Sequence, residues 1–320
     1  MGVKPELPTP VQDRHPPFRV VDGRVLGRLA ALVLAIVLVV AAWAWYRIGV
    51  IHVQQITRDV YALTGLGGNV GVLLTHEGAV VVDTMTFVRQ GTAILARIQR
   101  LTDRPVVAIL NTHYHMDHTH GNPAFIPGTK VVATTRTLKH LRELDAAFWR
   151  DRPASDLLPN VTFDTTQELR LGGKTVRALH LGHGHTDGDL VVLFVEDRVL
   201  HAGDLFFNGH FPNIDLEAGG STREWPETIG RALDLDFDAV IPGHGPVSDR
   251  EGFRRYQEFM ASLWSQTKQV ADRGGSLEDA LRDVDIERFD LHRLWFAPYL
   301  SRSFVIRRAY EEATAGRGGG

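Results

Sequence analysis

The sequence predicts an α/β domain, in which short strands alternate with helices, preceded by one transmembrane helix. An uncharged apolar run close to the N-terminus predicts the membrane helix. From about residue 50 onward, short β-branched segments bounded by Gly, Pro or Asp alternate with segments of helical periodicity. Strands and helices follow each other twice in a similar order, which suggests two similar halves. In addition, four histidines lie within residues 113–120, and this clustering points to a metal site.

The composition excludes several classes of protein. The chain has 320 residues, of which 44% are apolar and 23% charged, as in an ordinary folded protein rather than a disordered or fibrous one. Its net charge of -3 and the lack of a long Lys/Arg run argue against nucleic acid as a partner. Because the chain has no cysteine, disulfides, thiolate metal ligands and a cysteine nucleophile are excluded.

The N-terminal region reads as a flexible tail over residues 1–24 and a membrane anchor over residues 25–50. The tail holds five prolines and little apolar periodicity. The 18 residues Leu29–Tyr46 carry no charge and would rise about 27 Å as a helix, close to one hydrocarbon thickness. Two tryptophans and a tyrosine gather at its C-terminal end, as expected at a membrane interface.

Arginines set the expected orientation of this anchor. Four arginines precede the apolar run within residues 14–28, and only Arg47 and Arg58 follow it closely. This bias predicts a cytoplasmic N-terminus and a domain outside the cytoplasm. A cleaved signal peptide is the alternative, because Ala42-Trp43-Ala44 loosely fits a cleavage site; the domain would then be exported and soluble.

The catalytic domain is expected over residues 53–310, followed by a flexible tail over residues 311–320. Eight segments have the composition of strands. They are Val70–Thr75, Ala79–Asp83, Val106–Leu110, Lys130–Ala133, Thr175–Leu181, Leu190–Val195, Arg198–His201 and Ala239–Ile241. Four segments have helical periodicity, namely Val88–Leu101, Thr135–Trp149, Glu224–Leu235 and Glu251–Ala271.

The strongest chemical signal is the loop after the strand Val106–Leu110, which reads Asn-Thr-His-Tyr-His-Met-Asp-His. In an extended segment residues i and i+2 point the same way, so His113 and His115 can converge on one ion. Asp117 and His118, past the bend, can reach a second ion. Four metal-competent side chains at this spacing are hard to explain by packing alone.

Four further elements place a His or Asp at the end of a predicted strand, mostly beside a flexible glycine. These are Gly184–Asp189 with His185, Ala202-Gly203-Asp204, Pro242–Gly245 with His244, and Val82-Asp83-Thr84.

The four motifs H-x-H-x-D-H, G-H-T, G-D and P-G-H-G, in this order, resemble the metal-binding pattern of the metallo-β-lactamase-fold hydrolases. The resemblance covers about residues 55–250 and implies a four-layer αβ/βα sandwich. Carried over to this chain, it implies that His113, His115 and His185 hold one metal. Asp117, His118 and His244 would hold a second metal, and Asp204 would bridge both. Asp83 is expected to support a ligand by hydrogen bonding.

Two zinc ions are the expected cofactors, although nitrogen and oxygen ligands also suit iron or manganese. The resemblance implies that a hydroxide shared by both ions attacks the carbonyl of an ester, thioester, lactone or amide, with Asp117 as the residue that orients it and moves its proton. The alternatives are an iron-dependent oxidoreductase, a weak β-lactamase, a phosphodiesterase and a non-catalytic binding domain.

The substrate is expected to be a small molecule, and the resemblance narrows it only by exclusion. Position 204 is Asp, where the best-known broad-spectrum β-lactamases of this fold have Cys. Phe207 stands where those enzymes place the lysine that binds the drug's carboxylate. Efficient β-lactam hydrolysis is therefore not expected. The roles of four residues near the motifs, and the oligomeric state, stay open; the residues are His120, His183, Asn208 and His210.

Overall fold

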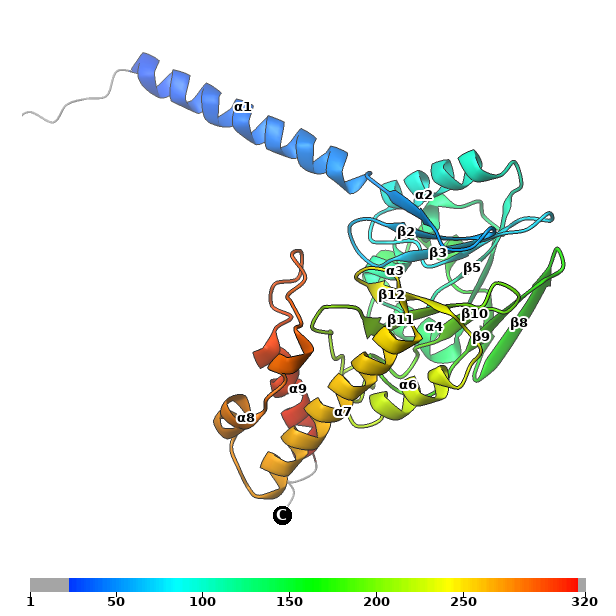
Figure 1. The fold of residues 1–320 in the computed structure, drawn as a ribbon. Coiled ribbons are helices and arrows are strands. Elements are labelled where there is room, and N and C mark those ends of the chain that lie inside the picture. The colour runs from blue at the N-terminus through cyan, green and yellow to red at the C-terminus, as the bar shows by residue number, and fades with distance from the viewer. Residues whose placement is uncertain (1–22, 316–320) are drawn as a thin grey trace, which may run out of the picture. The chain divides into compact units, whose positions relative to one another are not determined.

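Two β-sheets packed face to face form the centre of the domain, with helices on their outer faces (Figure 1). The computed structural model describes residues 23–315, so residues 1–22 of the predicted N-terminal tail, and residues 316–320, lie outside the described part. The chain divides into two units. Helix α1 (Gly23–Ile48) belongs to the first unit as far as Arg47, and the second unit begins at Ile48.

The first sheet has seven strands in chain order. They are β1 (His52–Gln55), β2 (Val60–Thr64), β3 (Val70–Leu74), β4 (Ala79–Val82), β5 (Val106–Leu110), β6 (Lys130–Thr134) and β7 (Val161–Phe163). Strands β1 to β4 pair antiparallel, whereas β4 to β7 pair parallel.

The second sheet has six strands in the order β13-β12-β11-β10-β9-β8. They are β8 (Thr166–Leu171), β9 (Lys174–Leu179), β10 (Val191–Phe194), β11 (Val199–Phe207), β12 (Ala239–His244) and β13 (Ser248–Asp249). Only the β11–β12 pair is parallel.

The longer helices lie on the outer faces of the sheets, and the shorter ones connect strands. They are α2 (Val88–Leu101), α3 (Met116–Thr119), α4 (Thr135–Glu143), α5 (Ala146–Trp149), α6 (Trp225–Leu233), α7 (Arg250–Asp272), α8 (Leu277–Asp283) and α9 (Arg302–Thr314). Short 3₁₀ turns lie at Asn122–Ala124, Ala154–Leu157 and Glu287–Phe289.

Alternation along the strands explains the layers. Val80 and Val82 of β4 pack into the core between the sheets, together with Val192 of β10. Val81, between them, faces the opposite way and packs in a second core that includes Ile94 of α2. A third and larger core lies between the second sheet and the helices α6, α7 and α9. The order is therefore helix, sheet, sheet, helix, which confirms the predicted α/β sandwich.

All eight predicted strands are present, and five more were not predicted: β1, β2, β7, β8 and β13. The predicted helix Thr135–Trp149 is two helices, because between α4 and α5 the backbone of Asp145 is not helical and its N–H donates to the carbonyl of His140, five residues earlier. Helix α9 continues to Thr314, so the start of the tail predicted for residues 311–320 is helical.

Strands β11 and β12 extend beyond the predicted ends and carry Asp204, the sixth of nine residues in β11, and His244, the last residue of β12. The ladder between them shifts register at Gly203, which has a φ of +51°. A Cβ atom at Gly203 would lie 2.7 Å from the side chain of Thr112, so only glycine fits there. This irregularity allows Asp204, the next residue, to approach the loop that follows β5.

Helix α1 (Gly23–Ile48) contains the predicted anchor. Its segment Arg28–Ile48, 21 residues long, is long and apolar enough to cross a membrane. A signal sequence near an N-terminus has the same properties, so the choice between anchor and signal peptide stays a prediction.

Candidate metal centre

Seven side chains from four parts of the chain meet at one end of the two sheets. The loop after β5 supplies His113 and His115, and α3 supplies Asp117 and His118. The loop before β10 supplies His185, while Asp204 and His244 lie on the ends of β11 and β12. All seven residues that the sequence predicted as ligands are therefore brought together, in two groups of possible ligands.

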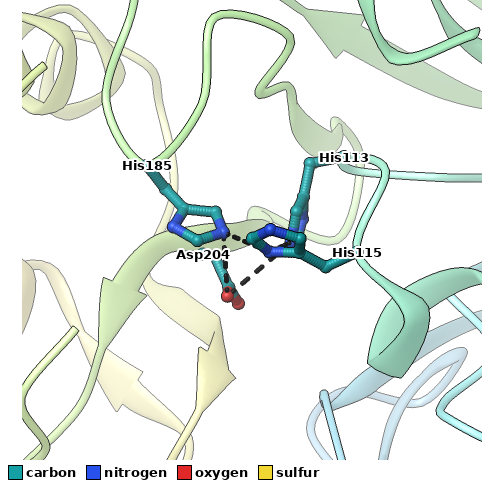
Figure 2. A group of neighbouring side chains, drawn as sticks. All are labelled: His113, His115, His185 and Asp204. Atoms are coloured by element: carbon teal, nitrogen blue, oxygen red, sulfur yellow. Dashed lines mark hydrogen bonds and ion pairs between the residues drawn. The ribbon is translucent and has the colours of Figure 1, made fainter. Parts of the chain in front are cut away.

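The first group consists of Asp204 and three histidines (Figure 2). The histidines, called the three-histidine cluster, are His113, His115 and His185. Nδ1 of His115 lies 3.2 Å from Nε2 of His113 and 2.7 Å from Nε2 of His185. His113 and His185 are completely buried. Three ring nitrogens thus point at one small volume.

The outward nitrogens of this cluster show where the protons lie. Nδ1 of His185 donates to the carbonyl of Asn213 at 2.9 Å, and Nε2 of His115 donates to the carboxylate of Asp215 at 2.9 Å. In neutral rings the inward nitrogens of both residues then carry lone pairs. Two lone pairs at 2.7 Å repel unless a cation lies between them, so this arrangement fits a bound metal ion.

The second group, the mixed cluster, consists of Asp117, His118 and His244. Oδ2 of Asp117 lies 3.3 Å from Nε2 of His244 and 3.8 Å from Nε2 of His118. Nδ1 of His118 donates to Asp83 at 2.7 Å, so its Nε2 carries the lone pair that faces the other ligands.

Asp204 lies between the clusters and turns one oxygen toward each. Its Oδ2 is 3.7 Å from Nε2 of His113 and 3.5 Å from Nε2 of His185. Its Oδ1 is 3.1 Å from Nε2 of His118 and 3.5 Å from Nε2 of His244. A carboxylate in this position can bind two ions at once.

Two buried atoms at the centre lack a hydrogen-bond partner among the described residues. They are Nε2 of His118 and Oδ1 of Asp204, which face each other. When the His118 ring is neutral both atoms are acceptors, and two acceptors held together in a buried place are unfavourable unless a proton or a metal cation joins them. The donor set of imidazole and carboxylate therefore fits a divalent cation of the zinc, iron or manganese type.

The electrostatic environment differs between the clusters. Burial and the neighbouring His115 lower the pKa of His185 to about 4, and burial and His118 lower that of His113. Burial alone would also lower the pKa of His244, but Asp204 and Asp117 raise it to about 9. The same carboxylates raise the pKa of His118 against the effect of its burial.

Asp83 supports the mixed cluster, as the sequence predicted. Its Oδ1 accepts from the backbone N–H of Thr112 at 2.8 Å, and its Oδ2 accepts from the Thr112 hydroxyl at 2.7 Å as well as from His118. Asp83 has a φ of +63°, in the left-handed region that is strained for an aspartate. Strain retained at a ligand-supporting residue is typical of functional sites.

A cavity of about 400 Å³ opens at the metal centre and is lined by four of the seven residues, His115, Asp117, Asp204 and His244. Asp117 is the most exposed of them, with 23% of its side chain accessible. Burial would raise the pKa of its carboxyl, but His118 and His244 hold the pKa well below its usual range. Asp117 is therefore ionised and in reach of water from the cavity.

The four residues whose roles were open do not line this cavity. His120 contacts Asp145 at 2.7 Å and stacks on Phe148. The side chain of Asn208 donates to the carbonyl of Pro246 at 2.8 Å. His210 pairs with His292 through a β-bridge, and His183 lies on the loop that precedes His185. Packing and loop support therefore account for His120 and Asn208.

Asp215 is a functional residue that the sequence analysis missed. It accepts from His115 and also from the hydroxyl of Tyr114, at 2.5 Å. Burial would raise its pKa, but the hydrogen bonds from His115 and Tyr114 hold the pKa well below its usual range. Asp215 belongs to none of the motifs and lies 100 residues after His115, so no local pattern connects the two.

Comparison with known proteins agrees with this geometry. Residues 63–244 match the model of the metallo-beta-lactamase superfamily. A linear primary-alkylsulfatase of Pseudomonas sp. is 23% identical over 73% of this chain and 53% of its own length. A type 2 metallo-beta-lactamase of Bacillus sp. is 27% identical over 63% of this chain and 79% of its own.

Among solved structures, a stereoselective inverting sec-alkylsulfatase from Pseudomonas sp. superposes with a TM-score of 0.66 at 18% identity. The match covers 82% of this chain and 50% of the alkylsulfatase, so the chain spans about half the length of these alkylsulfatases. At this identity the likeness concerns the fold. Together with the family match over residues 63–244, the two clusters and the sandwich fold show that the chain belongs to the metallo-beta-lactamase superfamily.

Proposed function

We propose that this protein is a hydrolase with two zinc ions, anchored in a membrane by α1, with its catalytic domain outside the cytoplasm. Its substrate would be a small molecule with an ester, thioester, lactone or amide bond. The observation that carries the proposal is the position of Asp204, which turns one oxygen to each cluster, 3.5 Å from His185 and 3.5 Å from His244. The three-histidine cluster would hold one ion and the mixed cluster the other.

Two ions in these clusters would supply a nucleophile at neutral pH by lowering the pKa of water to about 7, and they would polarise the carbonyl oxygen of the substrate. The protein's own contribution is to orient the ligands and to accept a proton. Asp117 lines the cavity and is ionised, so it can accept a proton from water during attack. Asp83 and Asp215 hold the rings of His118 and His115 in the tautomers that leave the inward nitrogens unprotonated.

The cavity lining supports an uncharged carbonyl substrate. Among the described residues that line it there is no Lys or Arg to bind a carboxylate or a phosphate. Phe207 lies against His244, with 4.9 Å between ring centroids, and presents an aromatic ring instead of a cation. This favours carbonyl hydrolysis over phosphodiester or β-lactam hydrolysis.

A second candidate is hydrolysis of an alkyl sulfate ester. The observation that favours it is the extent of the match, because the alkylsulfatase structure covers 82% of this chain, well beyond the family model. A sulfate ester carries a negative charge, for which only the metal ions would provide a partner in this cavity.

The decisive experiment measures metal content by mass spectrometry on the full chain purified in detergent, for the natural protein and for His244→Ala. Two zinc ions that fall to one in the variant would support the proposal. Bound iron, or no metal at all, would overturn it and favour redox chemistry or a binding role.

The same preparations are then tested on phenyl and thiophenyl esters, lactones and anilides, with nitrocefin and octyl sulfate alongside. Turnover of an ester or thioester that is lost in His244→Ala identifies carbonyl hydrolysis. Turnover of octyl sulfate alone would instead identify the second candidate.

A further inference from the structure

The cavity at the metal centre is lined by polar and apolar side chains. The possible ligands form much of the polar lining, and hydrocarbon and aromatic side chains form most of the remainder. The apolar wall is defined by Phe87, Phe207, Leu294, Phe296, Ala297 and Leu300. At about 400 Å³ the cavity has the size of an ordinary small-molecule pocket.

Much of the apolar wall comes from the loop between α8 and α9, and this loop is fixed in place. The backbone N–H of His292 donates to the carbonyl of Gly209 at 2.9 Å, and the N–H of Phe211 donates back to His292 at 3.0 Å. Three residues of the loop are buried in the core between the second sheet and the helices α6, α7 and α9, namely Leu294, Ala297 and Leu300. The wall is therefore a built surface, attached to the segment that follows β11.

Phe296 brings the wall next to the metal centre. Its ring centroid lies 5.8 Å from that of His244, while Phe207 stacks on the same imidazole. A group bound against Phe296 would thus lie beside the reacting bond. Aromatic rings and aliphatic side chains in this position stabilise a hydrocarbon group by removing it from water.

Apolar surface continues from the wall to the cavity mouth. Phe87 is 39% exposed, Met116 48% and Tyr299 62%, and all three line the cavity. Exposed apolar side chains that rim a pocket mark a binding surface rather than a random surface feature. A long hydrocarbon chain could lie along this path from the metal centre to the solvent.

We propose that the substrate carries a linear hydrocarbon chain on the acyl side of the scissile bond, and that Phe87 and Phe296 determine this specificity. The inference rests on the proposed function, since it assigns the substrate class of the same site. Fatty acyl esters or thioesters are the expected chemical class. The missing Lys and Arg in the lining described above agree with an uncharged chain.

The test uses the zinc-loaded full chain and 4-nitrophenyl esters from acetate to decanoate, below their micellar concentrations. We expect kcat/KM to rise about two- to fourfold for each added methylene until the cavity is filled. Phe296→Ser and, independently, Phe87→Ser should each lower the ratio of kcat/KM for decanoate to that for acetate about tenfold. Phe87 is partly exposed, so its variant is expected to fold. Ile126→Ser, which alters a 75% exposed side chain outside the cavity, is the matched control.

A binding measurement separates this inference from the proposed function. The affinity of a fluorescent fatty acid, cis-parinaric acid, is measured for the same four proteins. Ester hydrolysis without dependence on chain length would overturn the inference and leave the hydrolase proposal intact. If no ester is hydrolysed, but both Phe variants weaken parinaric acid binding about tenfold, the apolar site stands and the hydrolase proposal fails. If neither hydrolysis nor binding responds, both are overturned.

Discussion

The three-histidine cluster and the mixed cluster share Asp204, yet the pKa values of two histidines in each are shifted in opposite directions. In the first, burial and neighbouring imidazoles lower the pKa of His113 and His185. In the second, the carboxylates of Asp117 and Asp204 raise the pKa of His118 and His244 against the effect of burial. The number of carboxylates beside each ring, and not the degree of burial, makes the difference.

This difference bears on how metal enters. A metal ligand must be deprotonated, and the lowered pKa values of His113 and His185 leave these two rings ready for an ion at neutral pH. In the metal-free protein His244 holds a proton up to a pH of about 9, the carboxylates also favour protonated His118, and a metal ion must displace these protons. We therefore expect the three-histidine cluster to load first and the mixed cluster to load with release of protons.

The largest effect is expected from Asp204→Ala, which removes the carboxylate that both clusters share. We expect the loss of at least one metal ion and a fall in kcat/KM on the order of 10²–10³-fold, since electrostatic stabilisation of the reacting group is lost. Metal content by mass spectrometry and ester kinetics measure both. Asp103→Ala, at an exposed aspartate, is the control. Two metals with full activity in Asp204→Ala would refute the shared role.

Acidification is expected to separate the clusters. Protons compete with metal, so below a pH of about 9 the affinity of the mixed cluster should fall at least about tenfold per pH unit as pH decreases. The affinity of the three-histidine cluster should depend less steeply on pH over the same range, because the pKa of His185 is about 4 and that of His113 is also lowered. Zinc titrations against a chelator at several pH values measure both affinities. If the affinities for the two ions changed with pH at the same slope, the predicted difference between the clusters would be wrong.

Asp83→Asn and Asp215→Asn should each weaken one cluster. Both replacements remove the charge that orients a ligand histidine, which typically costs about 10–100-fold in metal affinity. Asp83→Asn should affect the ion of the mixed cluster through His118, and Asp215→Asn that of the three-histidine cluster through His115. Asparagine tolerates the left-handed backbone at position 83, so the fold should be retained. Zinc competition titrations test this, and an equal effect of both variants on the same ion would contradict it.

The smallest effect is expected from Tyr114→Phe. It removes one hydrogen bond to Asp215 and leaves the one from His115, so affinity for the first ion should fall less than about tenfold. The comparison is Tyr61→Phe, whose hydroxyl hydrogen-bonds the carbonyl of Arg58. A loss as large as that in Asp215→Asn would show that Tyr114 itself holds the carboxylate in place.

The sequence predicts those features of the molecule that depend on residues close together in the chain. The spacing of His113, His115, Asp117 and His118 is a local pattern, and three short motifs place His185, Asp204 and His244 each beside a glycine. The resemblance of these motifs to the metallo-β-lactamase-fold pattern then implied all seven ligands. The strands β4, β5 and β10 were predicted because β-branched runs are also local patterns.

Contacts between residues far apart in the chain could not be predicted from the sequence. Asp215 acts through a side-chain contact with a residue 100 positions earlier in the chain. Strand β1 is short and exposed, and β8 is only partly buried, so the pairing of both depends on their neighbours. The loop that carries Phe296 has no secondary-structure pattern of its own, and its role follows only from where the fold places it. The membrane orientation rests on arginine counts and stays a prediction.

The possible ligands and much of the apolar wall lie in different stretches of the sequence, which affects how the specificity of this protein could change in evolution. The family match ends at residue 244, the last of the seven possible ligands, whereas Leu294, Phe296 and Leu300 lie beyond it. The reactive centre and a large part of the wall that faces it are thus encoded in separate stretches, joined in space by the Gly209–His292 contact. Insertions, deletions or exchange of the loop between α8 and α9 could change which molecules bind in the cavity without changing any of the seven possible ligands.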